Sequence, residues 1–252
     1  MHKRGNGGNM SALSALIDDL VTANHILAHE GVVDAFGHVS VRHPDNPNRF
    51  LLSRARSPEL IEPSDIMEHG LDGQPTDGSG RKPYLERFIH AALYEARPDV
   101  QSVVHHHSHS VIPFGITGEK IKPVQHICAT IGHEIPIWDS HDKFGDTELV
   151  VSDMAMGRDF AAAIGNGRCA LMRGHGCSVV GASIQVAVYT AIYLEVNAEL
   201  QMSASRFGKI KFLTPGEIDK INSRVGRGQS GEGFQRAWEY WCRRAGVAPK
   251  RD

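Results

Sequence analysis

The chain has 252 residues, of which 41% are hydrophobic and 22% charged, which is typical of a soluble globular protein of one large or two small domains. Its formal net charge of −2 gives no reason to expect nucleic acid or an anionic membrane as a partner. The four cysteines form no CxxC pair, which favours reduced thiols in a cytoplasmic protein over a disulfide or zinc–thiolate framework.

The N-terminal stretch, residues 1–10, is polar and Gly-rich and lacks the apolar core of a signal peptide. We therefore expect a disordered tail followed by a single domain over residues 11–252. No apolar run is long enough to span a membrane. Apolar residues at helical spacing predict a first helix over 13–27, with Ser11 as its N-cap and Gly31 as its stop.

The next part of the chain alternates as strands and then returns to helical spacing. Strands are expected at 39–42 and 49–53 around a turn, and residues 72–73 form another turn before a loop at 75–82. A helix is predicted over 84–96 and ended by Pro98. The histidine-rich strand follows at once, over residues 103–110.

The second half of the chain predicts further strands flanked by helices. Pro113, Gly115 and Gly118 are expected to break up the stretch after the histidines. We predict strands at 124–127, 134–138, 169–173 and 177–180, and helices at 158–164, 184–205, from Pro215 onward, and at 233–245. Strands in the middle with helices on either side indicate one layered α/β/α domain, and the short turns favour a mostly antiparallel sheet.

Four histidines lie within five positions of the central strand: His105, His106, His107 and His109. Alternate residues of a strand point the same way, so His105 and His107 share one face, with His109 as a third candidate on it, and His106 faces away. Two imidazoles two positions apart on one strand face can bind a divalent metal ion, since neutral imidazole is the commonest protein metal ligand.

A catalytic metal usually needs a third protein ligand and an open coordination position. His175 is the best candidate, because it lies between two glycines at a strand end where nothing crowds the imidazole. Glu86, in the first turn of the helix before the histidine strand, is the expected acid–base partner. Three imidazoles accept Zn²⁺, Mn²⁺, Fe²⁺ or Co²⁺, so the identity of the ion stays open.

These motifs together resemble the class II aldolase/adducin family, over residues 13–195. The resemblance is carried by Glu86, by His105-x-His107 after Arg97-Pro-Asp-Val100, by Arg173-Gly-His-Gly176, and by the segment Gly37-His-Val-Ser-Val-Arg42. It implies an α/β/α sandwich, one divalent metal on the three histidines, and proton transfer by Glu86. It also implies a homotetramer with active sites at subunit boundaries.

Several positions depart from the sugar-phosphate aldolases of that family. Tyr84-Leu85 replaces the small hydroxyl residues before the glutamate, Gly37-His38 replaces Gly-Asn, and residues 53–57 replace the phosphate loop with Arg54 and Arg56. Arginine pairs with planar carboxylates, so Arg54 is the predicted substrate carboxylate ligand, with Ser53, His38 and Tyr84 beside it. The pattern is similar to the decarboxylase branch, whose members act on hydroxylated aromatic or pyridine dicarboxylates, 3-hydroxy-2-methylpyridine-4,5-dicarboxylate among them, and on carboxymuconic semialdehydes.

The sequence thus predicts a metal-dependent decarboxylase of a small hydroxylated aromatic or pyridine carboxylate. The resemblance implies that the hydroxyl and carboxylate chelate the metal and that CO₂ leaves through an enolate-like intermediate, with Glu86 or His109 moving the proton. Two alternatives stay open: a class II aldolase for a non-phosphorylated or acidic sugar-like substrate, and a non-catalytic adducin-like module. A solvated surface role for Arg54 also stays open.

Overall fold

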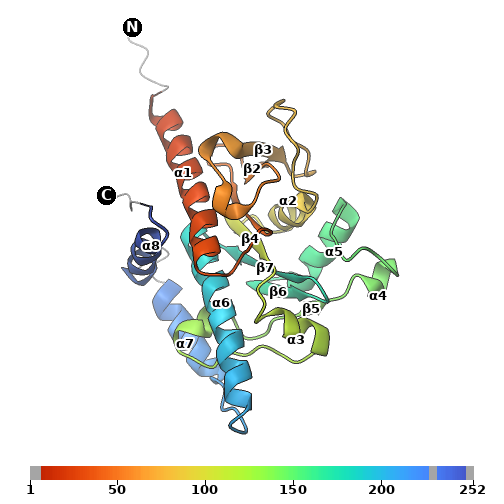
Figure 1. Ribbon diagram of the computed structural model, residues 1–252, viewed down its shortest axis with the longest axis vertical. Helices are drawn as coiled ribbons and strands as arrows, with labels where there is room; N and C mark the ends of the chain where they lie inside the picture. Colours follow the sequence, from red (N-terminus) through yellow and green to blue (C-terminus); the bar gives the residue numbers. More distant parts are fainter. Residues whose placement is uncertain (1–6, 227–231, 248–252) are drawn as a thin grey trace.

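A single mixed sheet organises the computed structural model, which describes residues 7–226 and 232–247 (Figure 1). Its strands are β1 (His38–Arg42), β2 (Arg49–Ser53), β3 (Ile66–Gly70), β4 (Ser102–His106), β5 (Ile137–Trp138), β6 (Cys169–Met172) and β7 (Gly176–Gly181). They are ordered β3-β2-β1-β4-β7-β6-β5. Every neighbouring pair is antiparallel except β5 and β6, which confirms the predicted mostly antiparallel sheet.

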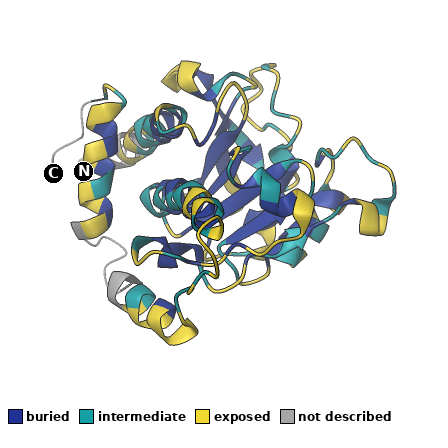
Figure 2. Cartoon of the chain, turned by 60° about the horizontal axis from the view of Figure 1, so that its bottom comes forward, coloured by how far each residue is buried: buried dark blue, intermediate teal, exposed yellow. Residues whose placement is uncertain are grey.

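Helices cover both faces of this sheet. The helices α1 (Gly7–His29) and α6 (Ile184–Ser205) pack on one face, and α2 (Arg87–Ala96) and α5 (Met154–Ile164) pack on the other (Figure 1). Val104 belongs to the first apolar core and Val103 to the second, because successive strand side chains point to opposite faces. The central strands are therefore buried on both sides, as Figure 2 shows, and the predicted α/β/α sandwich is confirmed.

Shorter elements complete the described chain. They are α3 (Ile112–Thr117), α4 (His141–Phe144), α7 (Pro215–Gly226) and α8 (Glu232–Arg244), with the 3-10 turns η1 (Pro58–Leu60), η2 (Pro63–Asp65) and η3 (Ile127–Ile131). The helix α8 packs outside α1 and α6. Within the described ranges, no helix is long and apolar enough to cross a membrane.

Several predicted boundaries were wrong at helix starts. The helix α1 begins at Gly7, so Ser11 lies inside it rather than at its cap, and residues 1–6 of the expected tail lie outside the described residues. The helix α2 begins at Arg87, which makes Glu86 its N-cap residue and not a member of its first turn. Pro113 does not break the chain: it lies in the first turn of α3, where a missing N–H leaves no helical hydrogen bond unmade.

The predicted strands differ from the structure at three places. The edge strand β3 was not predicted, since it pairs with β2 alone and its five residues show no clear alternation. No strand forms at 124–127, because side chains of α6 bind this backbone instead: Asn197 Oδ1 accepts the N–H of Val124 at 2.9 Å. The histidine strand ends at His106, so His107 lies just beyond the sheet.

Candidate metal centre

Three imidazole nitrogens converge where β4 and the β6–β7 turn meet. The Nε2 atom of His107 lies 3.0 Å from that of His105 and 3.0 Å from that of His175, and the third side of the triangle is 3.2 Å. An ion about 2.0–2.1 Å from each nitrogen would hold them about 2.9 Å apart at right angles and about 3.4 Å apart at tetrahedral angles. The triangle therefore has the dimensions of three ligands to one divalent metal ion.

The local backbone explains how the three rings come so close. His105 is held in the sheet opposite His38 on one side and Ser178 on the other. A side chain at Gly176 would place its Cβ 2.8 Å from the Cδ2 atom of His107 and 2.3 Å from the carbonyl oxygen of His106. Glycine at position 176 therefore leaves the space that the His107 ring occupies.

Further hydrogen bonds orient the rings. His105 Nδ1 lies 3.1 Å from Ser178 Oγ, and the His175 ring is hydrogen-bonded to the backbone of Leu149. Leu149 is the one non-glycine residue of the described chain with a positive φ, at 59°. Burial lowers the pKa of His107 to about 4, with further contributions from His105 and His175, so its ring is a neutral donor at pH 7. The hydrogen bonds with Ser178 and Leu149 hold the His105 and His175 rings in place, so that the Nε2 atom of each ring is available as a metal ligand.

Glu86 completes the donor set from the start of α2. Its Oε2 atom lies 3.4 Å from His105 Nε2 and its Oε1 atom 3.2 Å from His175 Nε2. Burial opposes ionisation of Glu86, but the two histidines outweigh it and hold the pKa of the carboxyl below its usual range. Apart from this contact with His175, Glu86 Oε1 is buried without a hydrogen bond, and the four ligand atoms lie within 4.8 Å of one another. A buried carboxylate is costly unless it is paired, and a cation at this position would pair with it.

The two other histidines of the motif lie elsewhere. His106 faces the opposite side of the sheet, where its Nε2 atom is 3.0 Å from Cys177 Sγ. His109, one of the two predicted proton carriers, is exposed and lies near Glu195, outside the four-residue donor set. Of the two predicted proton carriers, Glu86 therefore lies beside the three histidines and His109 does not.

Three of the predicted substrate residues lie next to one another beside the metal centre: His38, Tyr84 and Ser53. The His38 ring lies 5.1 Å from the His105 ring and 4.5 Å from the Tyr84 ring, measured between centroids. The Tyr84 hydroxyl lies 3.5 Å from Ser53 Oγ and accepts the N–H of Arg56 at 3.4 Å. Tyr84 therefore connects the histidines with the loop that follows β2.

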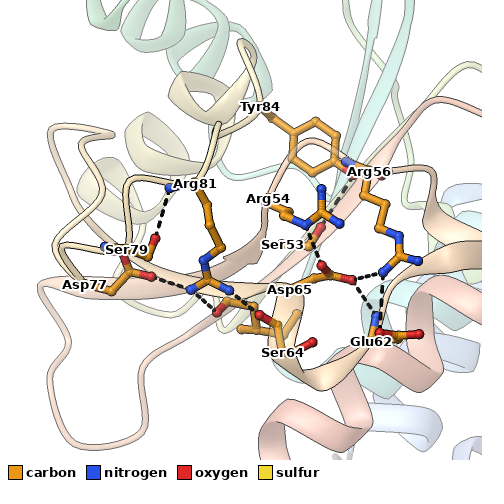
Figure 3. Close-up of polar contacts among 11 residues, drawn as sticks. Ser53, Arg54, Arg56, Glu62, Ser64, Asp65, Asp77, Ser79, Arg81 and Tyr84 are labelled. Carbon is orange, nitrogen blue, oxygen red and sulfur yellow. Dashed lines mark hydrogen bonds and ion pairs between the residues drawn. The ribbon is translucent and has the colours of Figure 1, made fainter.

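Arg54 lies in that loop and is paired (Figure 3). Its Nε atom donates to Asp65 Oδ1 at 2.5 Å, while Arg56 Nη1 donates to Asp65 Oδ2 at 2.6 Å. We call Arg54, Arg56 and Asp65 the arginine cluster. The Asp65 carboxylate is 5% exposed and the Arg54 side chain 39%, so a buried anion anchors a half-exposed cation. Among the described residues, neither Nη atom of Arg54 has a hydrogen-bond partner.

Four residues that support these sites were not predicted from the sequence: Asp65, Ser178, Leu149, and His90, whose Nε2 atom lies 2.6 Å from His38 Nδ1. A signal existed for His90, which follows Glu86 by four residues and so shares its helix face. No motif marks Asp65, because its importance comes from two arginines that reach it across the loop.

Comparison with known proteins adds a family and a set of relatives. Residues 18–202 match the family described as Class II Aldolase and Adducin N-terminal domain. The chain is 33% identical to "Decarboxylase tropJ" of Talaromyces stipitatus over 247 residues, covering 88% of this chain and 91% of that protein. It is 27% identical to a 3,4-dihydroxyphthalate decarboxylase of Arthrobacter keyseri over 246 residues, covering 91% and 93%. The structure of an L-fuculose 1-phosphate aldolase from Glaciozyma antarctica PI12 shares the fold, with a TM-score of 0.74 at 24% identity over 98% and 97% of the two chains.

Proposed function

The chain belongs to the class II aldolase and adducin family, and on this premise we propose that it is a metal-dependent decarboxylase of a hydroxylated aromatic or pyridine carboxylate. The two relatives compared above are named decarboxylases and the structural neighbour from Glaciozyma antarctica an aldolase, and both names describe carbon–carbon lyases. The complete donor set of three histidines and Glu86 argues against a non-catalytic adducin-like module.

The observation that carries the proposal is the triangle of Nε2 atoms with a buried carboxylate beside it. A divalent ion on His105, His107 and His175 would supply Lewis-acid chemistry to a hydroxyl and a carboxylate oxygen on neighbouring substrate atoms. The sheet and Ser178 hold the His105 ring, and the backbone of Leu149 holds the His175 ring, so these two ligands keep their geometry without rearranging.

Glu86 is suited to move the proton because it is ionised and lies against the ligands. It first accepts the proton of the substrate hydroxyl and then delivers it to the ring carbon that bears the carboxylate. The bond from that carbon to the carboxylate breaks, CO₂ leaves, and its electron pair restores the aromatic ring. The product oxygen regains a proton from solvent, so the net reaction exchanges the carboxylate for one hydrogen.

The arginine cluster is the proposed site of a second carboxylate. Both Nη atoms of Arg54 are unpartnered among the described residues, and a guanidinium can bind a carboxylate through two parallel hydrogen bonds. Asp65 binds the Arg54 guanidinium through Nε and leaves the edge with the two Nη atoms free. The 3,4-dihydroxyphthalate named for one relative carries the required hydroxyl beside one carboxylate and a second carboxylate next to it.

A screen of CO₂ release tests the proposal. The zinc- or manganese-loaded protein is assayed with 3,4-dihydroxyphthalate, a hydroxypyridine dicarboxylate and L-fuculose 1-phosphate, with metal-stripped protein as control. We expect metal-dependent CO₂ from a hydroxy-dicarboxylate. Cleavage of the sugar phosphate without CO₂ from any hydroxy acid contradicts the proposal and favours the aldolase alternative. A homotetramer remains a prediction, which light scattering on the same sample tests.

A further inference from the structure

A row of buried polar side chains lies between β1 and α2, on the face of the sheet that otherwise carries an apolar core. Ser40 follows His38 by two residues and so shares its strand face, while Tyr94 follows His90 by four and shares its helix face. All four are at most 3% exposed. We call His38, His90, Ser40 and Tyr94 the buried polar chain, and the proposed proton transfer uses none of its four members.

Short hydrogen bonds join these residues in sequence. Tyr94 Oη lies 2.8 Å from Ser40 Oγ, and Ser40 Oγ lies 2.6 Å from His90 Nδ1. His90 Nε2 in turn lies 2.6 Å from His38 Nδ1. His90 and Ser40 therefore have two partners each, and His38 forms the end nearest the metal ligands.

The phenol sets the direction of the chain. Burial raises the pKa of Tyr94 above its ordinary value, so its hydroxyl keeps its proton and must donate it. Among the described residues, Ser40 Oγ is the side-chain oxygen in reach, and the nearby backbone N–H of Val103 is itself a donor. Ser40 then has its own proton left to donate to His90 Nδ1.

The same logic fixes the proton on both imidazoles. A His90 ring that accepts at Nδ1 carries its proton on Nε2, which donates to His38 Nδ1. A ring nitrogen that accepts a hydrogen bond carries no proton, so an imidazole that accepts at Nδ1 carries its proton on Nε2. His38 accepts at Nδ1 and must therefore carry its proton on Nε2.

The His38 ring lies beside the metal centre. His38 pairs with His105 across the sheet, and its ring lies against the rings of Tyr84 and His105. Its Nε2 atom has no hydrogen-bond partner among the described residues, although the residue is 3% exposed. Gly37 permits this placement, because its φ of 100° favours glycine and an added Cβ would lie 3.0 Å from the carbonyl oxygen of His105.

We propose that His38 presents a fixed, neutral Nε2–H donor to the substrate at the metal centre, and that His90, Ser40 and Tyr94 are positioning residues that hold it in this tautomer. The proposed function enters only in naming what the donor meets, an oxygen of the hydroxy-carboxylate. A donor that cannot switch to an acceptor selects carboxylate and phenolate oxygens over substrate amino or amide N–H groups, which it would leave unpaired.

The tautomer can be read directly from the full-length protein by ¹⁵N NMR of labelled histidine, with and without zinc. We expect the His38 proton on Nε2, and a coupling across the His90–His38 hydrogen bond with the proton on His90. The His38→Asn spectrum assigns the signal, and the coupling assigns it in the wild type if that variant does not fold. A His38 proton on Nδ1 overturns the proposal whether or not the protein is a decarboxylase.

A matched pair of variants tests the consequence for binding. In His90→Gln the side-chain amide can still donate a hydrogen bond to His38, whereas the leucine side chain in His90→Leu has no donor. With salicylate as the probe and zinc-loaded protein, we expect the Leu variant to raise Kd about 10–100-fold and the Gln variant to stay within a few-fold of wild type, at equal zinc content. An unchanged Kd in the Leu variant, or equal losses in both, overturns the positioning role. If the wild type binds no salicylate, the tautomer measurement decides this proposal alone, and the screen of CO₂ release decides the proposed function.

Discussion

The metal centre and the arginine cluster both gather ionisable side chains at loop ends, but they balance them differently. At the metal centre, three imidazole nitrogens and the Glu86 carboxylate lie within 4.8 Å of one another. In the arginine cluster, the Asp65 carboxylate already lies between two guanidinium groups. The first site would be completed by a cation, as proposed above, whereas the side chains of the second already pair with one another and leave the Nη atoms of Arg54 free among the described residues. Damage to the first should therefore be all-or-none, and damage to the second graded.

The largest expected effect is the loss of the metal in His107→Ala. Removing one corner of the triangle leaves two imidazoles, which bind a divalent ion far more weakly, so we expect metal per subunit to fall from about one to near zero and activity to disappear with it. Elemental analysis of purified protein measures this. His141→Ala, an exposed histidine outside the centre, is the control. Equal metal content in the His107 variant and the wild type would remove these histidines as ligands.

The next effect separates proton transfer from metal binding. Glu86→Gln keeps the shape of the side chain and loses its basicity, so we expect kcat to fall about 10²–10⁴-fold while metal content is unchanged. The matched variant is His109→Asn, which should retain near-wild-type turnover because His109 is exposed and outside the donor set. The reverse outcome, a slow His109 variant and a fast Glu86 variant, assigns the proton to His109.

A graded effect is expected in the arginine cluster. Arg54→Ala should weaken transition-state binding of a hydroxy-dicarboxylate by about 1.5–3 kcal/mol, the usual contribution of a charged hydrogen bond, and of a hydroxy-monocarboxylate by much less. The ratio of kcat/KM for the two substrates measures this. Arg49→Ala is the control, since Arg49 lies on β2 and pairs with Glu68. Equal losses for both substrates would remove Arg54 from the carboxylate site.

The smallest effect concerns stability and pH. Burial opposes ionisation of Asp65, but hydrogen bonds from the Glu62 N–H, Arg54 and Arg56 outweigh it and lower the pKa of the carboxyl. A lowered folded-state pKa means that this stabilisation is complete above the unfolded pKa of about 3.9 and is lost as pH falls from there through the folded value. Urea unfolding from pH 6 to pH 3 should therefore show a shallower loss for Asp65→Asn than for wild type. Parallel losses would mean that Asp65 is not held ionised by its arginines.

Much of this protein was determined by local pattern alone. The helix α6 spans residues 184–205 as predicted, and β2 spans 49–53, because apolar periodicity reports which side of a segment is buried. The donor residues Glu86, His105, His107 and His175 were also selected from the sequence, and the structure brings all four together. Their motifs are short and local: two histidines two residues apart on a strand, and one histidine between glycines.

The tertiary structure alone decided which distant groups meet. Asp65 reaches Arg54 only because η2 folds back beside β2, and His38 meets His90 across 52 residues only because α2 covers β1. In the same way, Asn197 Oδ1 accepts the N–H of Val124, which a neighbouring strand would bind in a sheet. Periodicity records whether a residue faces the core, but it carries no information on which polar group from elsewhere lies opposite. That pairing depends on how the layers pack, because a buried polar side chain is stable only where packing supplies its partner.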